Sequence, residues 1–549
     1  MKKILKGAFI LVLCAMFFAA CGTTENSATA DGTKEEKVAK SDKQAAKEQK
    51  KAEKEKAKAE KQKAKDKKKA GKSKEAKSGN YLVPIEAAVV AGEYEEAYTL
   101  LSDETVQGQL GSDDIYNIDA GMMKLYSNDL PAASQHLGAV ADMDKLNEKY
   151  KDANKVELST LLLDPYSQPY VTYDYEDIYA VVFNSIAKLK DPATSDSAFQ
   201  DLKNIREMLL SMDQYRATIS ERIDKDMEET SASNSPEKEA KVFADSALAN
   251  YLALIYNKYN DRDGDQKDFF YNQMEKAYSQ KSYEGQSMPA KIDDEKNSVP
   301  AGKARLNVLA LMGLMGQKKG DNIADVGTPV TAITGKMKSN EGIVAAGAGI
   351  IASLADFVTG GLGTRTMKVK YTTFEPRQNE AVKCIVSIGG QDISLDMIEN
   401  IDKIAESCTA YDKYFDITRA KFRAVSRYAE ACAVYATTVY GAQIAAAKAA
   451  EKGGLAAKAA TAAAAAAPIA AGKVLNSTLD AIEEKDMADI RGVHYFPAQV
   501  QAGAIELNPG TYDVNIKFLN ASGTEIASQT KSVEVKAGQL NLLEVECQK

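Results

Sequence analysis

The chain of 549 residues contains no tryptophan and only two histidines, His136 and His494. A Ser/His/Asp triad and a histidine-based metal site both need imidazole side chains. With only two histidines in the chain, both kinds of site are improbable. The G-x-S-x-G, H-E-x-x-H and P-loop patterns are missing as well. A catalytic pair of carboxylates cannot be chosen among 78 acidic residues. The sequence therefore predicts a protein that is not an enzyme and that holds no cofactor and no metal.

Cysteine is also scarce, and no two cysteines have the C-x-x-C spacing of a zinc ribbon or a thioredoxin-like site. Two of the six lie near the start of the chain and four in its body; they are Cys14, Cys21, Cys384, Cys408, Cys432 and Cys547. An exported protein can form disulfides. Four cysteines allow three pairings, and the sequence does not choose among them.

The apolar run near the start, Gly7–Ala20, is shorter than the roughly 20 residues that a membrane-spanning helix needs. Three lysines precede it, which is typical of an export signal. The run ends in Phe18-Ala19-Ala20-Cys21-Gly22, which resembles the lipobox of bacterial lipoproteins, although Phe18 stands where leucine is usual. The resemblance implies that residues 1–20 are a lipoprotein signal peptide and that Cys21 carries the lipid. An ordinary secretory signal with a chance cysteine is the alternative.

The net charge of −8 conceals a basic segment and an acidic body. Residues 21–33 are small and polar, as in a flexible tether. Residues 34–78 form a Lys/Glu/Ala-rich stalk, in which Lys34–Lys77 contains nineteen lysines against nine acidic residues. Such a stalk cannot bury a core and is either helical or disordered. Its positive charge also suits contact with anionic lipid or cell-wall polymer. The rest of the chain is acidic, which disfavours binding to nucleic acid.

Residues 79–285 show a repeated helix–turn–helix pattern. Gly92 stands in the turn of the first unit and Asn128 in that of the second, 36 positions later. That spacing is close to the 34 residues of a tetratricopeptide repeat. Two further units follow around Pro192 and Gly264. We expect small residues to let the paired helices approach, and Gly or Asn to adopt the left-handed turn conformation.

Residues 300–549 change to a mixed pattern, which makes the expected fold class α+β. Strands are expected at about 305–317, 366–395 and 497–547, with a helical insertion at about 396–485. The clearest strand has Tyr512, Val514, Ile516 and Phe518 at alternate positions. Its neighbours predict a small antiparallel β-sandwich, and the insertion contains a long Ala-rich helical tract.

Two short motifs resemble ligand-binding loops, but each departs from the pattern that such a loop requires. Asp261–Asp265 has the acidic character of a calcium loop, but its glycine is at the wrong position. Gly347–Ala352 has the G-x-G-x-x-A form of a dinucleotide-binding loop, without the acidic residue expected about twenty positions later. We interpret it as part of a small-residue helix, with a membrane-touching hairpin as the alternative.

Several short stretches together resemble a family of uncharacterised bacterial lipoproteins that join a degenerate tetratricopeptide-like half to a β-containing half. The stretches are Asp174–Asp177, Phe374–Arg377, Asp396–Ala405, Asp489–Arg491, Phe496-Pro497 and Leu507–Tyr512. The last strands also look like PEGA-type sandwich modules. The resemblance implies a place in the cell envelope. It implies no activity and transfers no catalytic residue.

The sequence thus predicts a lipid-anchored envelope protein that binds a protein partner through stacked helix pairs, which usually form extended binding surfaces. Two alternatives stay open. One is a membrane-perturbing or envelope-remodelling protein that uses the Ala/Gly-rich segments, and the other is an enzyme acting on cell-wall polymer.

Overall fold

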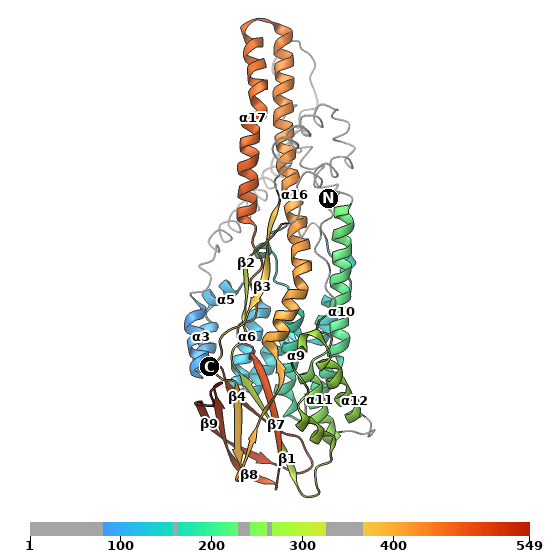
Figure 1. Cartoon of the computed structure of the whole chain (residues 1–549), viewed down its shortest axis with the longest axis vertical. Coiled ribbons are helices and arrows are strands. Elements are labelled where there is room, and N and C mark those ends of the chain that lie inside the picture. Colours follow the sequence, from blue (N-terminus) through green and yellow to red (C-terminus); the bar gives the residue numbers. More distant parts are fainter. Residues whose placement is uncertain (1–80, 158–162, 229–241, 261–265, 326–365) are drawn as a thin grey trace, which may run out of the picture. The chain divides into compact units, whose positions relative to one another are not determined.

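The computed structural model describes residues 81–157, 163–228, 242–260, 266–325 and 366–549. Within them the chain is a mixed α+β protein, as the sequence predicts. Residues Tyr81–Lys549 form one unit, with helices in its first part and strands and two long helices in its second (Figure 1).

Consecutive helices pack in pairs in the first part: α3 with α4, α6 with α7, α9 with α10, and α11 with α12. Their bounds are α3 (Leu82–Ala91), α4 (Tyr94–Leu101), α5 (Glu104–Leu110), α6 (Asp113–Tyr126), α7 (Leu130–Val140), α8 (Met143–Lys149), α9 (Asp174–Leu189), α10 (Ser195–Glu228), α11 (Ala247–Asn260) and α12 (Gln266–Tyr278). Short 3-10 turns lie between and after them: η1 (Ala153–Lys155), η3 (Pro165–Ser167), η4 (Lys281–Tyr283) and η5 (Ala290–Lys296).

The turns between the first helix pairs confirm the expected backbone conformation. Gly92 has φ of 82° and Asn128 has φ of 60°, both in the left-handed region. The prediction that small residues let paired helices approach is confirmed at Gly121, where a Cβ atom would lie 2.5 Å from Leu137 Cγ. Ser112 caps the start of helix α6, and its hydroxyl accepts hydrogen bonds from the backbone N–H groups of Asp114 and Ile115.

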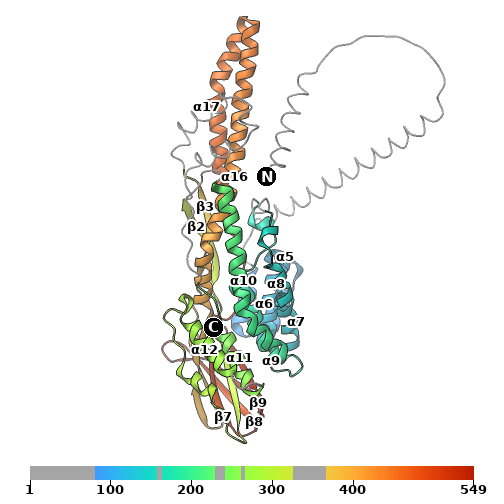
Figure 2. The ribbon, with the colours of Figure 1, turned by 90° about the vertical axis from the view of Figure 1, so that its right-hand side faces the viewer.

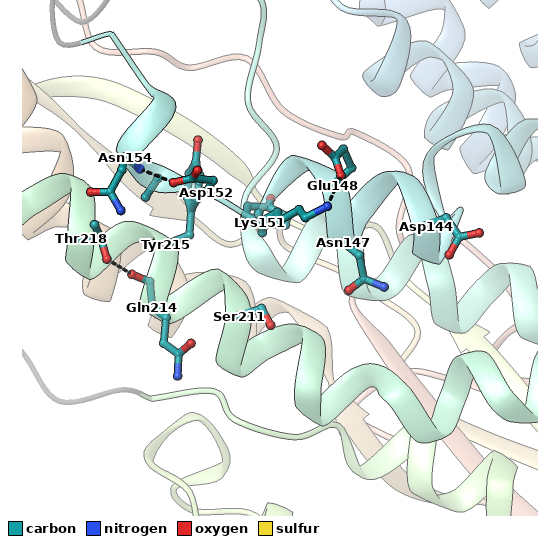
Figure 3. A pocket seen from close by; sticks show the side chains of 12 residues that line it. Asp144, Asn147, Glu148, Lys151, Asp152, Asn154, Ser211, Gln214, Tyr215 and Thr218 are labelled. Carbon is teal, nitrogen blue, oxygen red and sulfur yellow. Dashed lines mark hydrogen bonds and ion pairs between the residues drawn. The ribbon is translucent and has the colours of Figure 1, made fainter.

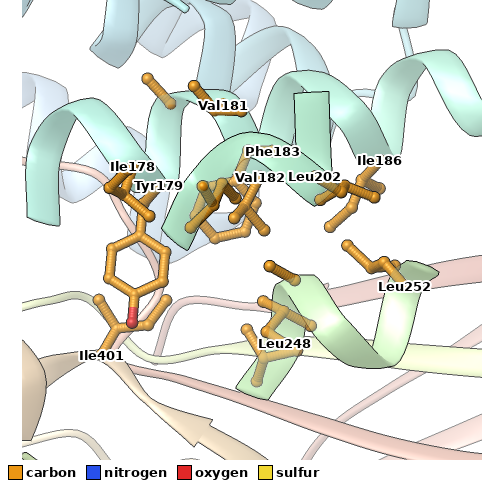
Figure 4. Close-up of a cluster of buried hydrophobic side chains, with 14 of the residues drawn as sticks. Ile178, Tyr179, Val181, Val182, Phe183, Ile186, Leu202, Leu248, Leu252 and Ile401 are labelled. Carbon is orange, nitrogen blue, oxygen red and sulfur yellow. The ribbon is translucent and has the colours of Figure 1, made fainter. Parts of the chain in front are cut away.

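The main hydrophobic core lies where the helices meet the sheet that contains β1 (Ala304–Met312), β6 (Asp396–Asn400) and β7 (Gln499–Leu507). Helix α9 contributes nearly its whole length to this core, and all but one of its residues are buried. Figure 4 shows Tyr179 and Phe183 of α9 beside Leu248 of α11 and Ile401, the first residue of α16 (Ile401–Lys452). The Phe183 and Phe496 rings, far apart in the sequence, have centroids 5.4 Å apart. The helical first part and the β-containing second part therefore share one core.

Two four-stranded sheets form the β part, in the orders β10-β1-β7-β6 and β5-β4-β8-β9, with β2 and β3 as a separate ribbon. The strands are β1 (Ala304–Met312), β2 (Gln317–Asp325), β3 (Lys368–Glu375), β4 (Lys383–Ile388), β5 (Gln391–Ser394), β6 (Asp396–Asn400), β7 (Gln499–Leu507), β8 (Gly510–Leu519), β9 (Glu525–Val535) and β10 (Asn541–Cys547).

The expectation of a wholly antiparallel arrangement is wrong, because β1 pairs with β10 in parallel. The chain between these two strands is long enough to return to the same edge, as a parallel pair requires. The alternation expected around β8 is confirmed: Val514, Ile516 and Phe518 are buried and Asn515 and Lys517 are exposed. These inward residues pack in a core shared with residues of the other sheet, such as Val308 and Val545.

Helices α16 (Ile401–Lys452) and α17 (Gly454–Lys485) form a long hairpin, the orange pair in Figures 1 and 2. The tract expected to be helical from about 396 begins with strand β6, and α16 starts at Ile401. The hairpin turns at Gly453-Gly454, whose φ angles are 68° and 81°. Strand β3 packs along the middle of α16. None of the helices in the described ranges is both long and apolar enough to cross a membrane.

Candidate functional site

An open groove of about 690 Å³ lies between α8, the η1 turn and helix α10 (Figure 3). We call it the α8–α10 groove. Its lining residues are Asp144, Asn147, Glu148, Tyr150, Lys151, Asp152, Ala153, Asn154, Ser211, Gln214, Tyr215 and Thr218. The groove therefore lies on the helical part of the molecule, where the repeat pattern predicts a partner surface.

The groove lining is polar and more acidic than basic. Asp144 and Glu148 are exposed on α8, and Lys151 Nζ lies 3.1 Å from Glu148 Oε2 in a solvent-exposed ion pair. Asp152 accepts a hydrogen bond from the backbone N–H of Asn154 at 3.0 Å, which starts the η1 turn. Since exposed ion pairs contribute little to stability, these charges are available to an incoming ligand.

Two tyrosine side chains in the groove are held in place by packing and hydrogen bonds. The rings of Tyr150 and Tyr215 meet edge to face, with centroids 5.4 Å apart. The Tyr150 hydroxyl donates to Asp177 Oδ2 at 2.6 Å, and Lys149 Nζ lies 2.9 Å from the same oxygen. Burial raises the pKa of Tyr150 well above its ordinary value, so this phenol stays a neutral donor. The groove is thus built on a fixed aromatic surface.

A buried acidic cluster joins α9, α10 and α16 near the groove. Arg216 Nη1 lies 2.7 Å from Asp174 Oδ2 and 3.0 Å from Asp412 Oδ1. Asp416, one turn after Asp412 on α16, accepts a hydrogen bond from the Tyr173 hydroxyl at 2.9 Å. Burial raises the pKa of Asp412 to about 8 and raises the pKa of Asp416. Two carboxyl groups at one guanidinium, with Asp416 close to Asp412, therefore favour retention of a proton.

A second buried charge pair connects β2 to the start of α9. Lys318 Nζ lies 3.0 Å from Glu176 Oε1 and donates to the Tyr170 hydroxyl at 2.6 Å. The same ammonium group is 3.5 Å from the centre of the Tyr173 ring. Burial lowers the pKa of Lys318 from its ordinary value. Because both charges have several partners, this pair fixes the ribbon to the helices rather than offering a free group.

A further buried carboxyl, Glu399 of β6, holds the sheet to the helices through hydrogen bonds. It accepts hydrogen bonds from the hydroxyls of Tyr179 and Ser246 at 2.8 and 2.9 Å and from the backbone N–H of Leu248 at 2.8 Å. Burial raises the pKa of Glu399 to about 7. None of Asp412, Asp416 and Glu399 lines the groove, so these acids act on structure and not on a ligand there.

The two histidines are not brought together. His136 lies 3.2 Å from the Tyr98 hydroxyl and 3.2 Å from Asn117 Oδ1, whereas His494 Nδ1 lies 2.8 Å from Asp119 Oδ2. Across the described ranges, no three His, Cys, Asp or Glu side chains are grouped so that they could hold a metal ion.

Several residues singled out from the sequence lie outside the described residues: Cys21, the Asp261–Asp265 segment and the Gly347–Ala352 loop. Cys384 and Cys547 are buried free thiols, and Cys408 is also buried. The groove residues were not singled out from the sequence. The only available signal was the clustering of Asp, Asn and Tyr after α8, which resembles any polar turn.

Comparison of the chain with protein families, with curated proteins and with solved structures finds no match.

Proposed function

We propose that this protein is a non-enzymatic, lipid-anchored scaffold of the bacterial cell envelope, and that its α8–α10 groove binds a segment of a protein partner. The observation that supports the proposal most is the groove itself, an open polar surface with a fixed aromatic part on the helical region. The pairing of consecutive helices supports a tetratricopeptide-like organisation of this region. The C-terminal strands would then be a PEGA-like sandwich module.

The chemistry of the groove defines the kind of partner that it fits. Asp144, Glu148 and Asp152 outnumber Lys151 among the charged lining residues. Asn147 and Gln214 offer amides, which can pair with a partner's backbone. A segment with lysine or arginine side chains, and an apolar or aromatic group for Tyr215, would match this surface.

Reversing charge in the groove tests the proposal. The double variant Asp144→Lys/Glu148→Lys should capture at least about tenfold less of the partner from the protein's own membranes, because two attractive contacts become repulsive. Glu275→Lys, an exposed acid of α12, is the matched control and should capture as much as the natural chain. Equal capture by all three proteins would contradict a role for the groove.

The anchoring part of the proposal has its own test. Cys21→Ala should leave the precursor uncleaved by the lipoprotein signal peptidase and abolish incorporation of a radioactive acyl chain, because the thiol that accepts the lipid is gone. The matched control, Cys14→Ala, should be processed and labelled normally. Labelled Cys21→Ala protein would show that the anchor is elsewhere.

A further inference from the structure

The far end of the α16–α17 hairpin, residues 440–474, has almost no core of its own; we call it the distal arm. The buried cluster at the base of the hairpin ends at Val439 and Leu475. Among the arm side chains that the structure describes, only Ala446 is buried. About half of the arm is alanine, which forms helices well without burial.

Large apolar side chains nevertheless stand out from the distal arm. Leu455, directly after the glycine turn, is 90% exposed, Ile469 is 67% exposed and Val474 is 65% exposed. Scattered exposed apolar residues are ordinary, so these side chains point to a ligand only together with the charges beside them. No segment in the described part of the chain covers these three side chains.

The distal arm is basic, unlike the acidic body that carries it. Its charged residues are Lys448, Glu451, Lys452, Lys458 and Lys473. Leu455 and Ile469 are about four helical turns apart, Lys458 follows Leu455 by three residues, and Lys473 follows Ile469 by four. This spacing puts the two apolar residues and the two lysines on one face of α17.

We propose that the distal arm docks on an anionic lipid surface. Leu455 and Ile469 enter the apolar layer, and Lys458 and Lys473 remain at the level of the negative headgroups. A second copy of the chain suits this face less well, because its arm carries the same positive charge. The inference goes beyond the proposed function, since neither the α8–α10 groove nor the expected lipid at Cys21 is needed for it.

The absence of tryptophan permits a position-specific test in the full chain. A single indole in Leu455→Trp should shift its emission to the blue with phosphatidylglycerol-containing vesicles, and brominated lipid should quench it. Pure phosphatidylcholine vesicles should leave it unchanged. Leu210→Trp, at a position of α10 that is 52% exposed, is the control and should not respond to either vesicle.

Charge reversal provides the second arm of the test. Adding Lys458→Glu and Lys473→Glu to Leu455→Trp should lower the quenching of the indole by brominated lipid at least about tenfold, while circular dichroism shows unchanged helix content. Sedimentation with vesicles but without an indole shift would assign binding to another segment, such as the basic stalk, and overturn the proposal. A shift that needs no lipid and grows with protein concentration would identify a second copy as the occupant, and would also overturn it.

Discussion

The two ends of helix α16 are held by different forces. At its base, Ile401, Ile404 and Cys408 are buried in the main core, and Asp412 meets the Arg216 guanidinium. At its far end, residues 440–452, nearly half of the residues are alanine, and Ile444 is 40% exposed. The base depends on tertiary contacts, whereas the far end depends on the helix propensity of alanine and on its pairing with α17. One continuous helix can therefore serve as a fixed support at one end and as an exposed surface at the other.

The largest difference between the two ends should come from removing a charge. Arg216→Met leaves Asp174 and Asp412 buried without their cation, and should lower the free energy of unfolding by about 3–5 kcal/mol in urea denaturation. Lys448→Met in the distal arm changes an exposed charge and should stay within about 0.5 kcal/mol. Equal losses would mean that the Arg216 cluster is not a tertiary anchor.

Removing the same side chain at each end gives a second comparison. Ile404→Ala creates a cavity in the main core and should cost about 2–5 kcal/mol of unfolding free energy. Ile444→Ala, on the same helix, should change it by no more than about 0.5 kcal/mol. Thermal and urea unfolding both measure this contrast, and a comparable loss from Ile444→Ala would show that the arm has a core after all.

A pH dependence at the base gives the last comparison. Burial raises the pKa of Asp412 to about 8, whereas an unfolded aspartate titrates near 4. Between these values the folded protein holds a proton that the unfolded chain releases. The contribution is therefore fully present below about pH 4 and is lost as the pH rises through about 8, at up to about 1.4 kcal/mol per pH unit.

Asp412→Asn should remove this part of the slope when the free energy of unfolding is measured by urea denaturation from about pH 5 to about pH 8. Glu399, whose pKa burial raises to about 7, should keep a weaker dependence of the same sign in that variant. The exposed Asp113→Asn is the control and should keep the full slope. An unchanged slope in Asp412→Asn would show that the carboxyl is ionised in the fold.

Local patterns in the sequence were sufficient for the mixed α+β class, for the alternation in β8 and for the left-handed turns at Gly92 and Asn128. These features depend on neighbouring residues, whose spacing directly decides which side chains share a face. The Ala-rich tract was likewise recognisable as helical, because alanine favours a helix in almost any surroundings.

Only the tertiary structure decided which distant segments of the chain contact one another. The parallel pairing of β1 with β10, the division of the C-terminal strands between two sheets, and the sharing of one core by both parts depend on burial between distant segments. The Arg216 cluster and the α8–α10 groove arise in the same way, from residues on separate helices. Spacing along the chain does not encode such contacts, because the folded chain chooses among many pairings by the apolar surface that each buries.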